Sequence, residues 1–280
     1  MKLLPESGRG HASSYARLFC VLNVAFCITV FTSCVPGRLA RIALPTDNGS
    51  PFPDFADVHA QLSTACRGVR TLTAELALAG RAGTERLRGR VHAGFERPDA
   101  MRLEGVAPFG PPAFILAARN RTATLLLPRD SRVLRGQRPD EILGALVGVA
   151  LGPADVLAIL TGCVLPAPIA ASGRLHERGW ASIALAGGAE LYLRRTTAWQ
   201  IRAARRNGWQ LEYPEWKGQF PSSVRLISDS QSVNVDLTAT VSQIQTNIDL
   251  DAAAFRVDVP SAARSLTLDE LREAGPLRGQ

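Results

Sequence analysis

Residues 70–97 read RTLTAELALAGRAGTERLRGRVHAGFER, and apolar and polar side chains alternate along both halves of this stretch. A period of two is typical of strands that bury one face. The halves are joined by Gly-Arg-Ala-Gly at 80–83, and a short glycine-containing connection between two alternating runs predicts a β-hairpin. The apolar face of this hairpin consists of Leu72, Ala74, Leu76, Leu78, Leu87, Val91, Ala93 and Phe95.

Further strands follow the hairpin with short turns between them, which predicts an antiparallel meander. We expect a mainly β fold with some α: a single curved antiparallel sheet of about 11 strands, forming an unclosed β-barrel. Besides the two strands of the hairpin, the predicted strands are 101–104, 114–118, 122–127, 132–134, 173–177, 180–185, 189–194, 199–204, 209–213, 223–228 and 232–241.

Helical spacing of apolar residues appears before the hairpin and in the middle of the chain. The two middle segments, 142–149 and 154–160, are apolar almost all round, so we expect them to be buried against the concave face of the sheet. A last short helix carries a capping box of Thr267 and Glu270. The predicted helices are 54–69, 142–149, 154–160 and 267–273.

The N-terminus has the pattern of an export signal. Basic residues prevail in 1–17, and 18–31 is apolar but shorter than the roughly 20 residues that span a bilayer. The exit, Phe31-Thr32-Ser33-Cys34, resembles the lipobox of bacterial lipoproteins, in which the cysteine is acylated after cleavage, although Leu, Val or Ile is usual where Phe31 stands. We therefore predict lipidation at Cys34; a plain cleavage site and an uncleaved anchor are the alternatives.

The export signal and the predicted strands and helices together divide the chain into four parts. These are a signal peptide (1–33), a lipidated tether (34–53), a half-barrel domain (54–262) and a C-terminal helical tail (263–280). The tether is rich in Pro and Gly and has no sustained period. Of the 5 cysteines, Cys66 and Cys163 lie in the half-barrel domain. In an oxidising compartment they could form a disulfide, or each could be a buried free thiol.

Nucleic acid is not an expected partner, because the net charge of +7 is not gathered into a basic cluster with interleaved aromatics. Enzyme motifs are absent too: no GxSxG, Walker or GxGxxG sequence follows a predicted strand. His59, His92 and His176 fall on separate predicted elements, and no His or Cys spacing suits a metal. We predict no catalytic residues, no metal and no cofactor.

The order of motifs resembles that of the LolA/LolB superfamily of periplasmic lipoprotein carriers and receptors. The likeness spans 54–260 and ends on DAAAFRVDVP at 251–260. With a lipobox-like Cys34, the outer-membrane receptor (LolB-like) branch fits better than the soluble carriers. The most specific stretch, 95–162, contains Glu96-Arg97-Pro98-Asp99, Met101-Arg102-Leu103-Glu104, Pro108-Phe109-Gly110, Phe114-Ile115-Leu116 and Leu134-Arg135-Gly136.

The resemblance implies an apolar cavity that holds acyl chains of lipid or lipoprotein cargo under movable helices. It also implies a membrane-insertion loop at Pro108, Phe109 and Gly110, with a soluble periplasmic carrier as a possible partner. We expect a monomer anchored in the outer membrane and facing the periplasm. The alternative is an envelope sensor or structural lipoprotein that binds a protein. The residues predicted to line the cavity are Leu76, Val91, Leu103, Leu146 and Leu157.

Overall fold

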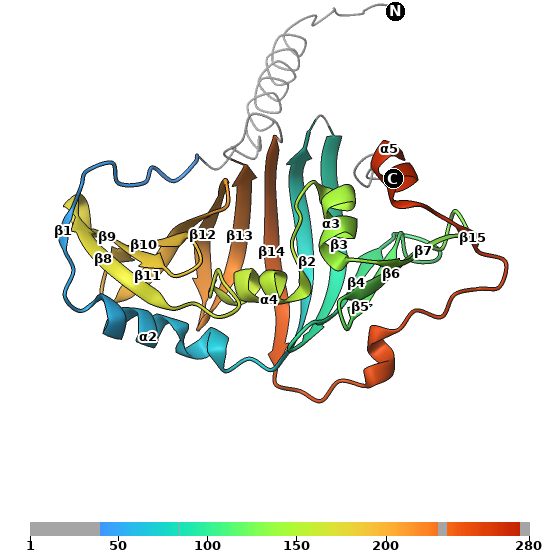
Figure 1. The fold of residues 1–280 in the computed structure, drawn as a ribbon, viewed down its shortest axis with the longest axis horizontal. Helices are drawn as coiled ribbons and strands as arrows, with labels where there is room; N and C mark the ends of the chain where they lie inside the picture. The colour runs from blue at the N-terminus through green and yellow to red at the C-terminus, as the bar shows by residue number, and fades with distance from the viewer. Residues whose placement is uncertain (1–39, 84, 229–233, 275–280) are drawn as a thin grey trace, which may run out of the picture. The chain divides into compact units, whose positions relative to one another are not determined.

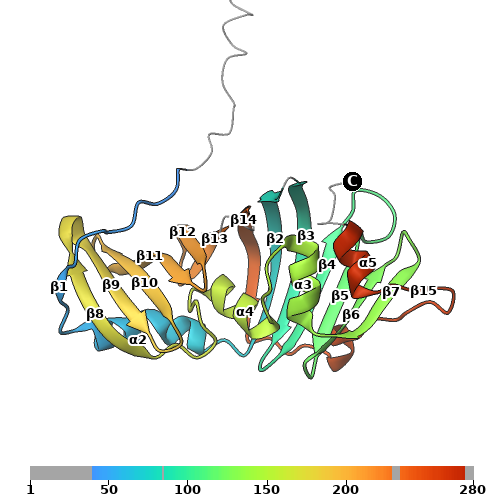
Figure 2. The ribbon, with the colours of Figure 1, turned by 45° about the horizontal axis from the view of Figure 1, so that its top comes forward.

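A single curved sheet runs through the chain in the computed structural model, which describes residues 40–83, 85–228 and 234–274 (Figures 1 and 2). Within these residues the sheet has 15 strands, in the order β1-β8-β9-β10-β11-β12-β13-β14-β2-β3-β4-β5-β6-β7-β15. The strands are β1 (Ser50–Pro51), β2 (Thr71–Ala82), β3 (Glu85–Glu96), β4 (Ala100–Val106), β5 (Ile115–Arg119), β6 (Thr122–Leu127), β7 (Arg132–Gln137), β8 (Ala170–His176), β9 (Trp180–Leu185), β10 (Ala189–Arg195), β11 (Trp199–Arg206), β12 (Trp209–Lys217), β13 (Phe220–Ser228), β14 (Val235–Thr246) and β15 (Arg264–Ser265).

The hairpin predicted from residues 70–97 is confirmed. β2 and β3 pair antiparallel along their whole length, with Leu76 opposite Val91 and Ala82 opposite Glu85. Because successive side chains point to opposite faces, the apolar members of each strand line one face of the sheet, which we call the inner face. One row of inner-face side chains crosses neighbouring strands through Ala74, Ala93, Leu103, Leu116, Leu125 and Leu134.

The predicted strand number of about 11 was too low, since the sheet has 15 strands in the described residues. The strands at its two edges, β1 and β15, have 2 residues each. Strands this short carry no alternation, so only the three-dimensional pairing with β8 and β7 reveals them. The sheet is also not purely antiparallel, because β15 runs parallel to β7.

Helices cover the inner face, as the sequence predicts. α2 (Phe55–Arg67) packs over the β8–β12 half of the sheet, and α3 (Pro139–Val147) and α5 (Leu268–Ala274) cover the half that contains β2–β7. α4 (Pro153–Thr161) lies between them, packs mainly on β13 and contributes to the hydrophobic clusters of both halves. Gly148 and Gly162 end α3 and α4 with φ of 76° and 86°, a left-handed conformation that glycine adopts without steric cost. Among the described residues, no helix is both long and apolar enough to cross a membrane.

A disulfide joins Cys66 near the end of α2 to Cys163 just after α4, with 5.7 Å between the two Cα atoms. The sequence left this pairing open, and the structure shows it. Both cysteines are buried and pack against Ala158. The bond therefore ties the helix over one half of the sheet to the helix over its middle.

The C-terminal segment wraps around the sheet. After β14 it crosses the outer face, where the 3-10 helix η2 (Ala252–Phe255) packs on β4 and β5, and Arg102 donates hydrogen bonds to the carbonyl oxygens of Ala254 and Arg256. It then pairs as β15 with β7 and returns to the inner face as α5 (Figure 1). Leu266 and Leu271 are buried in the same cluster as α3, so residues of the predicted tail 263–280 complete this core.

The N-terminal segment 42–53 lies along the sheet. The Ile42 N–H donates a 2.6 Å hydrogen bond to the Glu212 carboxylate, and Gln210 donates to the Ile42 carbonyl oxygen. Phe52 is buried against Trp199, with ring centroids 5.4 Å apart. The last part of the predicted tether therefore contacts β11 and β12.

Candidate functional site

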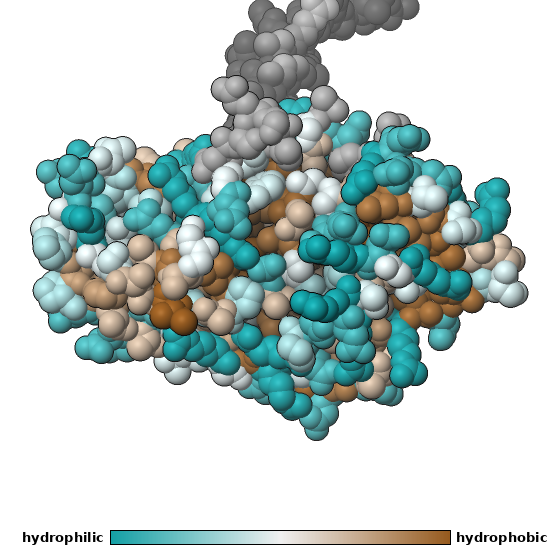
Figure 3. Space-filling view, in the orientation of Figure 1, coloured by the Kyte–Doolittle hydropathy of each residue, from teal (hydrophilic) through white to brown (hydrophobic). Residues whose placement is uncertain are grey.

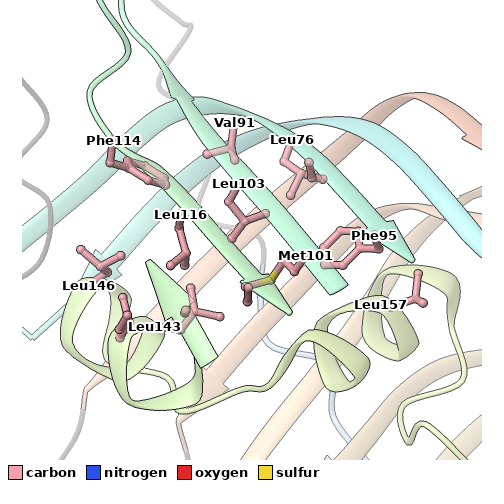
Figure 4. Packing of buried hydrophobic residues seen from close by; sticks show 14 of the residues in the cluster. Leu76, Val91, Phe95, Met101, Leu103, Phe114, Leu116, Leu143, Leu146 and Leu157 are labelled. Atoms are coloured by element: carbon pink, nitrogen blue, oxygen red, sulfur yellow. The ribbon is translucent and has the colours of Figure 1, made fainter. Parts of the chain in front are cut away.

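The five predicted cavity residues are all buried and belong to one hydrophobic cluster. Leu76, Val91 and Leu103 project from β2, β3 and β4 toward the helices (Figure 4). Leu146 on α3 and Leu157 on α4 approach them from the other side (Figure 4). Strands and helices thus bring these residues together.

A mostly apolar pocket of about 320 Å³ opens where this cluster meets one end of the strands, and its lining also includes Arg88, Arg90, Arg129 and Asp130. Val91 and Leu146 line it, whereas Leu76, Leu103 and Leu157 are not among its lining residues. Leu271 and Ala274 of α5 line it from above. Figure 3 shows hydrophobic residues reaching the surface of this face beside α5 and again between α3 and β14.

Glycine leaves room for this pocket on the inner face of β3. Gly89 lies between Leu87 and Val91, and a Cβ atom built on it would meet no atom within 4 Å. Gly105 on β4 has the opposite role, since its missing side chain lets the Phe114 ring pack directly on the strand. On the inner face, the pocket is therefore open at Gly89, and the Phe114 ring closes it at Gly105.

The loop between β4 and β5 forms the rim of the pocket, to which Ala107 and Pro108 contribute. Phe109 is 88% exposed. Arg129 holds the loop by donating a 3.0 Å hydrogen bond to the Phe109 carbonyl oxygen, and Gly110 has a φ of 76°. The predicted insertion loop thus lies at the pocket and presents its aromatic side chain to solvent.

The short helix α5 is fastened over the pocket by the predicted capping box. The Glu270 carboxylate accepts hydrogen bonds from the Thr267 N–H and hydroxyl at 2.7 and 2.9 Å, and Arg132 of β7 donates to it at 2.7 Å. The hydrogen bonds from Thr267, and then the one from Arg132, lower the pKa of Glu270 to about 2. The roof of the pocket is therefore held partly by one ionised carboxylate.

A second pocket, of about 340 Å³, lies on the outer face beneath η2. Its lining includes Glu75, Arg102 and Glu104, and these charges are already compensated. Arg102 pairs with Glu104 at 3.0 Å, and Gln243 donates to Glu75 at 2.8 Å. The inner-face pocket has charged lining residues too, so what favours that pocket for an acyl chain is the exposed Phe109 loop at its rim.

One series of hydrogen-bonded side chains, Asp47, His176 and Ser182, was not predicted from the sequence. Asp47 Oδ1 lies 2.9 Å from His176 Nδ1, and His176 Nε2 lies 3.0 Å from Ser182 Oγ. This is the order of groups in a Ser-His-Asp triad, and the hydrogen bond with His176 lowers the pKa of Asp47. Ser182 is only 3% exposed and lines neither pocket, so we interpret the series as a fastening of the N-terminal segment to β8 and β9.

The remaining predictions about the site concern histidines, metals and the anchor. His59 is buried in α2, and burial, followed by the charge of Arg67, lowers its pKa. Among the described residues, no group of three or more His, Cys, Asp or Glu side chains could hold a metal ion. The predicted lipidation site, Cys34, lies outside the described residues.

Comparison with known proteins gives structural likenesses at low identity. No protein-family model and no curated protein matches the sequence. A LolA superfamily protein, NE2245 from Nitrosomonas europaea, is 11% identical with a TM-score of 0.49, covering 72% of this chain and 97% of that one. A DUF1329 family protein from Desulfovibrio piger is 11% identical with a TM-score of 0.46, covering 72% and 95%. Lipoprotein LppX from Mycobacterium tuberculosis is 11% identical with a TM-score of 0.30, covering 69% and 96%.

These scores carry no inference about what the present chain binds. What the chain binds is inferred from its own pocket, loop and sequence motifs.

Proposed function

We propose that this protein is a lipoprotein of the bacterial envelope that binds acyl chains of lipid or lipoprotein cargo in the inner-face pocket. The observation that carries the proposal is the apolar pocket of about 320 Å³ between β3, the 107–113 loop, α3 and α5. Binding sites for small apolar ligands have volumes from about 300 Å³ upward and mostly apolar linings. Each CH2 group transferred from water is worth about 0.8 kcal/mol, so about six of them contribute about 5 kcal/mol.

The proposed location is the periplasmic side of the outer membrane, with Cys34 as the anchor. The signal-like N-terminus supports export. The Cys66–Cys163 disulfide supports an oxidising compartment, because such bonds are rare where thiols are kept reduced.

The exposed Phe109 beside the pocket supports a role in delivery. In this proposal a monomeric, LolB-like receptor takes cargo from a soluble carrier, and Phe109 enters the bilayer as the cargo leaves. The protein uses no catalytic residue, metal or cofactor.

A substitution that fills the pocket tests acyl binding. Gly89→Leu places a side chain into open space, so we expect the fold to be retained. Replacing a glycine inside a strand also removes an entropic cost of roughly 0.5–1 kcal/mol, so the unfolding temperature should not fall. We expect at least about a tenfold loss of affinity for a fluorescent fatty acid, since about two CH2 groups lose their place.

The matched control is Gly94→Leu on the same strand. A Cβ on Gly94 also meets no atom within 4 Å, but Gly94 lies five residues along β3 and therefore on the outer face. Equal fatty-acid binding by both variants and the unchanged protein would refute the proposed pocket. The absence of co-purified lipid in native mass spectra of the exported protein would also refute the proposed pocket. A protein partner captured in place of lipid would favour the envelope-sensor alternative.

A further inference from the structure

Arginines gather on the outer face of the sheet at the tip of the β2–β3 hairpin. Arg86, Arg88 and Arg90 alternate with the inner-face residues of β3, and Arg81 of β2 pairs directly opposite Arg86. All four are exposed. We call these four residues the arginine stripe.

The stripe carries uncompensated charge within the described residues. Arg90 has an acidic neighbour, Glu75, at 3.7 Å, and its side chain is still 70% exposed. Arg86 and Arg88 form no ion pair with any described residue, and Asp236, the cross-strand neighbour of Arg81, is already paired with Arg225. Like charges directly opposite each other destabilise a strand pair, so the Arg81–Arg86 pair opposes folding. A negatively charged partner outside the chain would remove that cost.

The topology brings the stripe to the same end of the sheet as the Phe109 loop. In an antiparallel meander alternate connections lie at the same end, so the β2–β3 turn and the β4–β5 loop are neighbours. Val106, at the end of β4, pairs with Arg90, and Ala107 and Pro108 of the loop line the pocket together with Arg88 and Arg90. The stripe, the exposed Phe109 and the pocket rim therefore lie at one end.

The chain also enters the compact unit at this end. Ile42 is bound by Gln210 and Glu212, at the start of β12, and Trp209 pairs with Ser228 at the end of β13. β14 begins at this same end, where Val235 pairs with Ala82 beside the hairpin tip. The N-terminal end of the segment in Figures 1 and 2 (blue) accordingly lies on the same edge as the tip of β2–β3.

We propose that the arginine stripe binds the headgroups of an anionic phospholipid bilayer and so turns the pocket mouth and Phe109 toward the membrane. The inference rests on the proposed function, to which it adds the charge of the target membrane and the face that meets it. Guanidinium groups bind phosphate in a bidentate manner, and an aromatic side chain beside them suits the boundary between headgroups and acyl chains. A nucleic acid would satisfy the arginines but offers no apolar phase for Phe109.

The test is vesicle co-flotation of the exported chain carrying Cys34→Ala, so that the lipid anchor does not dominate binding. The variant combines Arg81→Gln and Arg86→Gln, the two members of the stripe that do not line the pocket. We expect it to lose about 30-fold in affinity for phosphatidylcholine vesicles that contain phosphatidylglycerol, and little for phosphatidylcholine alone. Added salt should weaken the binding of the unchanged protein and have little effect on the variant.

The matched control replaces two exposed arginines elsewhere by glutamine: Arg121 and Arg178. It removes the same charge, and Arg121 lies at the other end of the strands in the β5–β6 turn. An equal loss in both double variants, or equal binding to charged and neutral vesicles, would overturn the proposal.

Fatty-acid binding separates this proposal from the proposed function. The stripe variant should keep its affinity for the fluorescent fatty acid and an unchanged or higher unfolding temperature. If the unchanged protein binds charged vesicles through the stripe but takes up no fatty acid, the pocket proposal fails and the docking surface stands. If fatty acid binds and the stripe variant docks on charged vesicles like the unchanged protein, the docking proposal fails and the pocket proposal stands.

Discussion

Phe109→Ser should weaken the contact with neutral membranes without affecting the fold. Phe109 is 88% exposed, so its side chain contributes little buried area to the native state. Moving a phenylalanine side chain from water into an apolar phase is worth about 2 kcal/mol, which corresponds to roughly 30-fold in binding. We therefore expect about a 30-fold weaker association with vesicles of phosphatidylcholine alone, where the arginine stripe contributes little.

The assay is co-flotation of the chain carrying Cys34→Ala, followed by thermal unfolding of the same samples. Ile169→Ser is the control, because Ile169 is also exposed, at 64%, but does not line the pocket. Ile169→Ser should leave vesicle binding unchanged. The reasoning is wrong if the two variants bind vesicles equally, or if Phe109→Ser loses the 3–5 kcal/mol of stability typical of a truncated core aromatic.

Three further outcomes are expected. Cys34→Ala should give an exported protein that leaves the membrane fraction on gentle washing; persistent tight association would contradict lipidation. Cys66→Ser combined with Cys163→Ser should lower the free energy of unfolding by about 2–4 kcal/mol, because the bond closes a loop of 97 residues in the unfolded chain; an unchanged thermal midpoint would count against this. The pKa of Glu270 is lowered from 4.5 to about 2, so its contribution to holding α5 is complete above pH 4.5 and is lost as the pH falls toward 2. Cleavage within α5 by an acid-active protease should increase over that range, and Glu270→Gln should abolish the pH dependence.

The hairpin and the helices were readable from sequence because each has a local cause. Alternation over 70–97 fixes the inner face of β2 and β3, and the register then follows from the short turn. The predicted helices 142–149 and 154–160 correspond to α3 and α4, each with proline at its start and glycine after its end. Thr267 and Glu270 form the predicted capping box.

The features that the sequence did not reveal depend on contacts between distant segments. β1 and β15 exist only because short stretches pair with β8 and β7. Asp47 lies 129 residues from His176, and no local pattern links them. The fastening of the N-terminal segment and the wrapping of the C-terminal segment were missed for the same reason.

Alternation of apolar and polar residues does not predict where on the inner face the pocket opens. Alternation assigns a residue to a face but gives neither the level along a strand nor the strand at which a pocket opens. Leu103, one level away from Val91, and Leu76, opposite Val91 on the neighbouring strand, were therefore grouped with it as cavity residues. In the structure leucine side chains fill the row at Leu103, Leu116 and Leu125. Nearer the hairpin tip, Gly89 occupies a position where the alternation requires an apolar side chain, and the pocket opens there. A glycine on the apolar face of a long strand costs stability, so its presence at that position favours a space that a ligand fills.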